Sequence, residues 1–235
     1  MFISVLQGQP PGMLQEFDVA SVKANHSGSD SAAMQLGKGS LTITNATLTK
    51  IMGAAFGISE DRDANLLVGP DWMQSERYDV IAKFPTSTSM DQMRMMLQSL
   101  LKERLRMKFH REIREVPAYA LVVAKHGLRA RTAAEGNTGG FRRRAGHLES
   151  RSATMAALAD KLSQQSDRPV VDRTGVRGSY EFMLDWAPNE LQTNGLAGTS
   201  LFTAIEEQLG LKLEARKEPL EVVVVDFAAK VPSEN

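Results

Sequence analysis

The stretch Leu201–Asp226, LFTAIEEQLGLKLEARKEPLEVVVVD, decides how the fold of this chain is interpreted. Apolar residues recur at helical spacing from Phe202 to Leu209, and Gly210 ends the predicted helix. Two strand-like runs follow, and they meet at Pro219, because proline interrupts the hydrogen bonding of a central strand. We therefore predict a helix followed by a hairpin, with the valines at 222–225 in a central strand.

A weaker copy of this stretch lies upstream at Glu103–Val123, ERLRMKFHREIREVPAYALVV. Two shorter matches occur at nearly the same separation: Ala46–Leu48 with Ala153–Met155, and Tyr78–Val80 with Tyr180–Phe182. A nearly constant separation favours an internal duplication with small changes in loop length. The alternative is a chance match, because helix and strand periodicity by themselves create some similarity.

The duplication predicts the domain organisation. Residues 1–16 are a disordered or trimmed leader, 17–125 a first unit, 126–146 a Gly- and Arg-rich joint, and 147–235 a second unit with a polar tail. Each unit is expected to run strand, helix, strand, helix, strand, strand. Short helices packed on one face of a small mixed or antiparallel sheet give an α+β fold with two tandem related units.

The composition is that of a globular protein, with 235 residues and an apolar fraction of 42%. The absence of cysteine excludes disulfides, zinc ribbons and thiol nucleophiles. Twenty-eight basic residues balance twenty-eight acidic ones, so no overall field attracts nucleic acid or an anionic membrane. No apolar run reaches the roughly 18 residues of a membrane span. The opening MFISVLQGQPPG is not a complete signal peptide; it is either the trimmed end of an export signal or a disordered start.

Residues with catalytic potential are scattered. The four histidines lie at positions 26, 110, 126 and 147. Their spacing matches no zinc motif, so we predict no metal and no cofactor. Ser99 and Lys102 have the Ser-x-x-Lys spacing of acylating enzymes, but this serine lies within a predicted helix and the companion motifs are missing. Asp172–Gly175 resembles an aspartyl-phosphate motif only superficially, and a tight turn explains it better.

The candidate binding residues are aromatic or basic: Trp72, Tyr78, Arg142, Arg143, Arg144 and Trp186. The arginines belong to a concentrated basic region that could grip phosphate or an acidic partner through bidentate contacts. The alternative interpretation is a solvated joint, and the scarcity of aromatic residues there argues against nucleic acid. The aromatic residues could line a groove, although tryptophans in small α/β domains are more often core anchors.

Several motifs resemble one protein family. They are FDVASVK at 17–23, GPDW at 69–72, DRPVVDRTGVRGSYEFMLDW at 167–186 and the closing PSEN, together with the two stretches quoted above. The chain resembles a soil-bacterial family of unknown function that is abundant as paralogues in Acidobacteria-type genomes, and the match covers nearly all of it after Phe17. It departs from the family pattern at Ala24, Phe56 and Phe227.

The resemblance implies an exported protein, periplasmic or secreted, since relatives usually begin with a signal peptide and some are joined to BlaR-type membrane peptidases. It implies no catalytic residues. The second half is also similar to the small N-terminal modules of secretins and TonB-dependent receptors, which are binding and signalling domains.

Together these features favour a non-enzymatic, extracytoplasmic interaction module, whose sheet edges or shared groove bind a peptide, an envelope protein or a small ligand. The alternative is a hydrolase with a site at the joint, using His126 or His147 with Glu149 or Asp172. Nucleic-acid binding through the Arg-rich joint is a third hypothesis.

Overall fold

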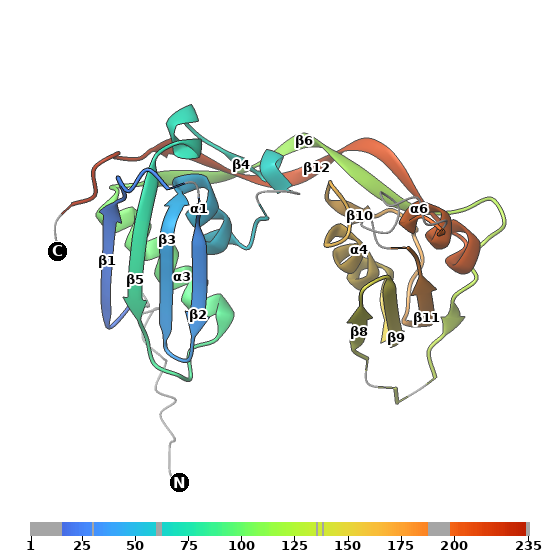
Figure 1. Cartoon of the computed structure of the whole chain (residues 1–235). Coiled ribbons are helices and arrows are strands. Elements are labelled where there is room, and N and C mark those ends of the chain that lie inside the picture. The colour runs from blue at the N-terminus through green and yellow to red at the C-terminus, as the bar shows by residue number, and fades with distance from the viewer. Residues whose placement is uncertain are drawn as a thin grey trace, which may run out of the picture. The chain divides into compact units, whose positions relative to one another are not determined.

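The computed structural model describes residues 16–29, 31–59, 63–134, 136–137, 139–187 and 198–233 (Figure 1). Its fold is α+β, with short helices and three four-stranded sheets among these residues. The chain forms two compact units. Unit 1 combines Met1–Glu60, Ala64–Glu112 and Glu221–Asn235, and unit 2 combines Asp61–Asp63 and Ile113–Leu220. The predicted leader falls almost entirely outside the described residues.

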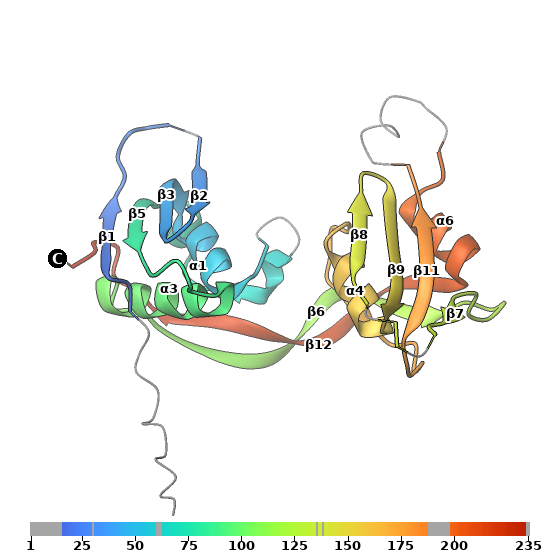
Figure 2. The same cartoon turned by 90° about the horizontal axis from the view of Figure 1, so that it is seen from below.

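Unit 1 contains an antiparallel sheet with the strand order β1-β5-β3-β2. Its strands are β1 (Val19–Ala24), β2 (Ala33–Gly37), β3 (Ser40–Thr47) and β5 (Arg77–Lys83). The helices α1 (Leu48–Phe56) and α3 (Met90–Arg104) contact each other and cover one face of this sheet (Figure 2). The 3-10 turns η1 (Ala64–Leu66) and η2 (Asp71–Gln74) flank the short strand β4 (Leu67–Val68).

Local sequence signals account for the helix ends of unit 1. Thr47 accepts a hydrogen bond from the Lys50 amide and begins α1, and Gly57 ends α1 with a left-handed φ of 70°. Helix α3 begins with a capping box formed by Ser89 and Gln92. The sequence predicts such a box one residue earlier, beginning at Thr88; the serine hydroxyl takes the cap position instead.

Unit 2 contains a second antiparallel sheet, with the strand order β7-β11-β9-β8. Its strands are β7 (Arg131–Thr132), β8 (Phe141–Arg144), β9 (His147–Ala153) and β11 (Tyr180–Asp185). The helices are α4 (Met155–Ser163), α6 (Leu201–Ala204) and the π-helical η3 (Ile205–Leu209). The helix predicted from Leu201 to Leu209 is therefore confirmed, and Gly210 ends it with a φ of 65°.

The third sheet has the order β10-β6-β12-β4, and its two middle strands are long: β6 (Lys108–Val123) and β12 (Leu211–Phe227), beside β10 (Val170–Asp172). Both hairpins predicted from the sequence are therefore wrong, because each chain segment continues through its proline as one strand. Pro117 and Pro219 lie before the residues of β6 and β12 that pair with β10 and β4. Each proline thus sits where its strand lacks a neighbour on one side, as in an edge strand.

Each unit has its own apolar core. In unit 1, residues such as Ile43 and Leu97 pack with Val223 and Val225 from the end of β12. The four-valine run is confirmed as part of a central strand, since β12 lies between β6 and β4. The core of unit 2 joins α4 to the β9–β11 region and includes Leu121 of β6.

Two segments predicted as irregular contain strands. The range 126–146, predicted as a joint, lies within unit 2 and contributes β7 and β8. The polar, Gly- and Ser-rich range 24–40, for which the sequence predicts a long loop, contains β2. This strand is exposed along its whole length and so lacks the alternating pattern of a half-buried strand. Both antiparallel sheets place their elements in the same chain-order pattern. The duplication itself stays a prediction, which superposition of the two units would test.

Candidate functional site

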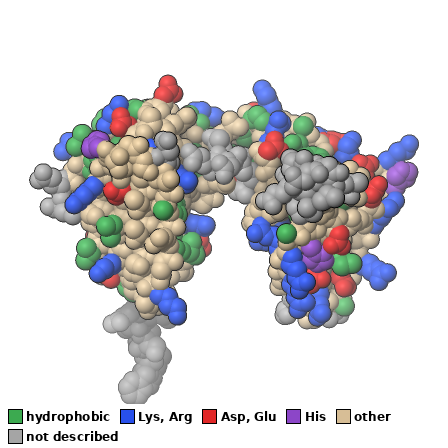
Figure 3. All heavy atoms as spheres, in the orientation of Figure 1, with side chains coloured by type: hydrophobic (Ala, Val, Ile, Leu, Met, Phe, Trp, Pro, Cys, Tyr) green, Lys and Arg blue, Asp and Glu red, His purple; other side chains and the backbone are tan. Residues whose placement is uncertain are grey.

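The solvent face of the β7-β11-β9-β8 sheet carries a group of charged side chains. Alternation along the strands turns Leu148, Ser150, Phe182 and Leu184 to the buried side. The residues between them therefore face solvent: Arg142, Glu149, Arg151, Glu181 and Met183. Figure 3 shows basic and acidic side chains gathered over β8, β9 and β11.

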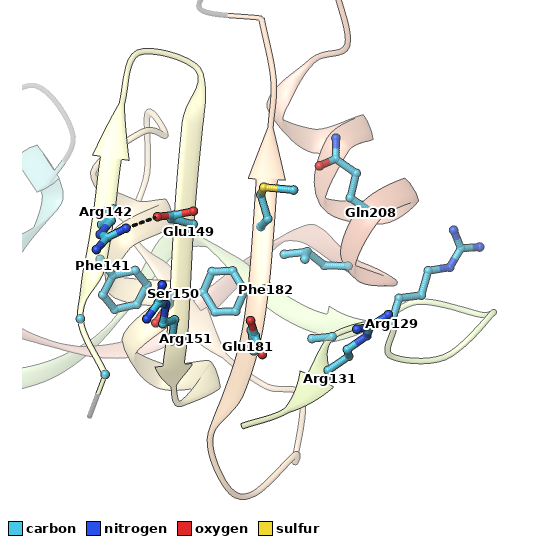
Figure 4. A pocket seen from close by; sticks show the side chains of 15 residues that line it. Arg129, Arg131, Phe141, Arg142, Glu149, Ser150, Arg151, Glu181, Phe182 and Gln208 are labelled. Carbon is cyan, nitrogen blue, oxygen red and sulfur yellow. Dashed lines mark hydrogen bonds and ion pairs between the residues drawn. The ribbon is translucent and has the colours of Figure 1, made fainter. Parts of the chain in front are cut away.

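A cavity of about 750 Å³ lies over this sheet, and we call it the basic hollow. Its charged lining consists of Arg129, Arg131, Arg142, Arg151, Glu149 and Glu181. Figure 4 shows Arg142 and Arg151 on one side, and Arg129 and Arg131 beyond β11 on the other. Met183, on the exposed face of β11, adds apolar surface to the lining. With four guanidinium groups and two carboxylates, the hollow has an excess of positive charge.

The charges alternate across neighbouring strands. Arg142 lies opposite Glu149 and forms an ion pair with it at 3.3 Å, and Glu181 lies opposite Arg131. Arg129 donates to the backbone carbonyl of Glu207 at 2.5 Å. Within the described ranges, the side chains of Arg131 and Arg151 have no ion pair or hydrogen bond recorded with protein atoms. Ion pairs between adjacent strands on an exposed sheet face are weak. The arginine side chains of the hollow therefore remain available to an anionic ligand.

The walls of the hollow are held by specific backbone contacts. The Gln208 side chain bonds Asp185 twice, accepting from its amide at 2.9 Å and donating to its carbonyl at 2.7 Å. This ties η3 to the end of β11. Gly210 packs so tightly against Gly127 that a Cβ atom there would lie 1.9 Å from the Gly127 carbonyl oxygen. Single π-helical turns such as η3 often occur beside functional sites.

A histidine lies on the same sheet face, outside the hollow. The Nδ1 atom of His147 lies 2.6 Å from an oxygen of Asp185, and its Nε2 atom lies 3.7 Å from Glu149. The His147–Glu149 part of the hydrolase hypothesis is thus brought together, but both ring nitrogens face carboxylates. A hydrolytic triad needs one nitrogen to face a nucleophile. The nearby Ser150 points to the buried side, where its hydroxyl accepts from the Ser152 amide.

The other residues of the hydrolase hypothesis lie apart from this pair. His126 lines a separate, smaller cavity with Phe202 and Glu206. Asp172 accepts hydrogen bonds from the Thr174 amide and hydroxyl, so the predicted turn is confirmed. Among the described residues, no group of three or more His, Cys, Asp or Glu side chains is arranged to hold a metal ion.

In unit 1, a histidine has a similar environment. His110 Nδ1 lies 2.9 Å from Asp226, and Nε2 lies 3.6 Å from Glu112. The hydrogen bond to Asp226 raises the pKa of His110 above its usual value. The contact joins β6 to β12 on an exposed surface.

The predicted binding residues fall into both units. Trp72 is half-buried, and Tyr78 is 1% exposed and donates its hydroxyl to the Lys230 carbonyl at 2.8 Å; Lys230 Nζ also lies over the Trp72 ring. These two aromatics therefore anchor the C-terminal segment to unit 1. Trp186 is half-buried against the core of unit 2. Only Arg142 of the predicted residues lines the basic hollow; Arg143 and Arg144 follow it on β8.

A family model described as "Protein of unknown function (DUF3738)" matches residues 20–228. The chain belongs to this family. DUF3738 thus covers both units, including the basic hollow. No curated protein and no solved structure matches the chain. In the described part of this DUF3738 member, every helix is too short or too polar to cross a membrane.

Sequence reasoning missed part of the hollow. Arg151, Glu181, Met183 and Gln208 were not among the residues predicted to bind a ligand. The alternation along β9 and β11 would have placed the first three on the exposed sheet face. Gln208 could not be found in this way, because its contact depends on how η3 packs against β11.

Proposed function

We propose that the protein is a non-enzymatic, extracytoplasmic binding module that takes an anionic ligand in the basic hollow of unit 2. The observation that carries this proposal is the placement of Arg131 and Arg151 at one cavity without protein partners among the described residues. A guanidinium group offers a planar fork of donors that fits a carboxylate or a phosphate. The exposed Met183 side chain in the lining favours a ligand that also has a nonpolar part.

The acidic residues of the hollow support this role. Glu149 holds Arg142 at 3.3 Å, so that arginine is partly ordered before a ligand arrives. Glu181 lies opposite Arg131 and reduces the net positive charge of the hollow. A smaller net charge favours ligands of low charge over polyanions. An open hollow on a sheet face also differs from the water-excluding cleft that most catalysis needs.

The hydrolase alternative rests on the His147–Asp185 contact. If His147 were a general base, the protein would hydrolyse a model ester such as p-nitrophenyl acetate faster than buffer alone does. The variant His147→Gln would then lose this extra rate. We expect the protein and this variant to give the same rate, since Nε2 faces Glu149 and no nucleophile. A rate that depends on His147 would favour the hydrolase.

The extracytoplasmic location rests on the family resemblance of the motifs. Fractionation of cells that produce the protein naturally tests it directly. Recovery in the cytoplasmic fraction alone would contradict this part of the proposal, and it would leave the ligand site unaffected.

Binding is tested by adding inorganic phosphate or citrate to the ¹⁵N-labelled protein and following its amide resonances. We expect shifts centred on β9, β11 and the residue 129–131 segment. The variant Arg131→Gln/Arg151→Gln should bind at least about 100-fold more weakly, because it removes two charge-assisted hydrogen bonds that contribute about 1.5–3 kcal/mol each. The matched control is Arg177→Gln/Arg216→Gln, which removes the same charge from exposed positions outside the hollow. Equal weakening by both variants would refute a defined site.

A further inference from the structure

The free edge of unit 2's antiparallel sheet is strand β8, Phe141–Arg144. It pairs with β9 on one side only, so alternate residues direct their amide and carbonyl groups to the open side. At Gly140, directly before β8, no described atom lies within 4 Å of the position that a Cβ would take. A side chain at this position would therefore meet no steric obstacle.

The side chains of β8 give this edge a strong positive charge. Arg142, Arg143 and Arg144 are all exposed, and among the described residues the guanidinium groups of the last two have no ion pair. Arg142 and Arg144 point to the face that carries the basic hollow, because they lie opposite Glu149 and His147. Two cationic side chains at alternate positions match the two-residue repeat of an extended peptide.

The other face of β8 has a different character. Phe141 lies in the same row as the buried Ser150 and Phe182, and its ring packs near Phe182 with the centroids 6.0 Å apart. Lys161 of α4 lies over the Phe141 ring at 5.5 Å. Arg143, opposite Leu148, is on this face too. A strand added beside β8 would therefore meet Arg142 and Arg144 on one face, and Phe141 with Arg143 on the other.

We propose that β8 binds an extended acidic peptide by strand addition, with Asp or Glu at alternate positions facing Arg142 and Arg144 and apolar residues between them. Main-chain hydrogen bonds to the open edge supply the alignment, and the arginines select the acidic partner. The occupant is chosen by charge complementarity. Nucleic acid fits less well, because Phe141, the aromatic residue of this strand, is half-buried in packing and offers no open face for base stacking.

This inference rests on the proposed binding function and adds the ligand class and the mode of contact. It competes with a simpler explanation, since arginines on an edge strand also prevent sheets from pairing with one another. The two explanations differ in one respect: edge protection needs only the charges, whereas strand addition needs the peptide's backbone amides.

The test uses the full chain and a fluorescently labelled peptide, acetyl-Glu-Val-Glu-Val-Glu-Val-Glu-amide, with binding measured by fluorescence anisotropy. Two comparison peptides have the same charge: one carries its glutamates and valines in two blocks, and the other is N-methylated at alternate residues. We expect at least about tenfold weaker binding for both, because one loses the alternation and the other loses the main-chain donors.

The protein variant for this test is Arg144→Gln, which leaves the hollow intact, with Arg177→Gln as the matched control and circular dichroism as a check of folding. We expect about tenfold or greater loss for the β8 variant and less than about twofold change for the control. Equal binding of the N-methylated peptide would overturn strand addition, and so would tighter binding of single-stranded DNA of the same length.

Separate outcomes distinguish the two proposals. Peptide binding that depends on Arg131 and Arg151, but not on Arg144, would refute strand addition and leave the basic hollow as the ligand site. Phosphate or citrate binding without any peptide binding would do the same. Peptide binding at β8 without phosphate or citrate binding would instead move the ligand site from the hollow to the edge. If neither probe binds, both proposals fail.

Discussion

Tyr78 connects the core of unit 1 to the C-terminal segment. Its replacement by phenylalanine should lower the stability of unit 1 near neutral pH and raise it at high pH. The side chain is 1% exposed, and its hydroxyl donates to the Lys230 carbonyl at 2.8 Å. Burial, with a smaller contribution from the negative charge of Glu76, raises the pKa of Tyr78 to about 12. The wild-type hydroxyl therefore stays protonated in the folded protein at pH values where an unfolded tyrosine ionises.

At pH 8, Tyr78→Phe removes one hydrogen bond and leaves the Lys230 carbonyl without its donor. The expected loss is about 1 kcal/mol in the free energy of unfolding of unit 1. Above pH 10 the balance changes. Unfolded tyrosine loses its proton at a pKa of about 10. Above this pH the unfolded state therefore binds fewer protons than the folded state. Wild-type stability falls for this reason as the pH rises from about 10 to about 12. By about pH 11.5 the loss reaches about 2 kcal/mol.

The variant has no phenol at this position and lacks that alkaline loss. It should therefore be less stable than wild type by about 1 kcal/mol at pH 8 and more stable by about 1 kcal/mol near pH 11.5. Lysines and arginines also titrate in this range, but they are the same in both proteins and cancel in the difference. Full wild-type stability is present below about pH 10.

The assay is urea unfolding followed by tryptophan fluorescence in a Trp186→Phe background, in which Trp72 alone reports on unit 1. Both proteins are measured from pH 8 to about 11.5. If the difference in unfolding free energy stays constant over this range, ionisation of Tyr78 is not coupled to folding. A variant that is as stable as wild type at pH 8 would show instead that the Lys230 contact contributes nothing.

Two further predictions concern the backbone. Gly210→Ala should destabilise unit 2 by more than about 1 kcal/mol, because the φ of 65° disfavours a side chain and the added Cβ would lie 1.9 Å from the Gly127 carbonyl oxygen. Thermal unfolding followed by Trp186 fluorescence measures the change in stability. An unchanged unfolding midpoint would contradict the prediction. Truncation after Leu220 should unfold unit 1 by removing the last part of β12 from its core, exposing Trp72 and shifting its fluorescence to longer wavelength. Retention of the native Trp72 spectrum would show that unit 1 does not need this strand.

Elements with strong local signals were predictable from the sequence. Helix α1 has apolar residues at helical spacing, a threonine cap at 47 and a terminal glycine at 57, and all three features appear in the structure. Strand β5 alternates buried and exposed residues along its length, as its sequence RYDVIAK predicts. The turn at Asp172 also follows local chemistry, because the carboxylate bonds backbone and side-chain groups two residues away.

The paths of β6 and β12 were not predictable in the same way. A proline inside a strand usually indicates an edge or an end, so Pro117 and Pro219 favoured hairpins. Whether the chain turns or continues depends on which strands lie beside it, and β10 and β4 come from distant parts of the sequence. Strand β2 escaped prediction for a related reason: its residues are all exposed, so only its pairing with β3 defines it.

The sequence by itself determined the α+β class, the glycine that ends α1, the strands with clean alternation and the concentration of arginines around 142–144, because each depends on residues close together in the chain. The tertiary structure decided that these arginines form an edge strand, that Arg131 and Arg151 meet at one hollow, and that Tyr78 is buried beneath Lys230. These features depend on pairing and packing between segments far apart in sequence, and local propensity carries no information about such partners.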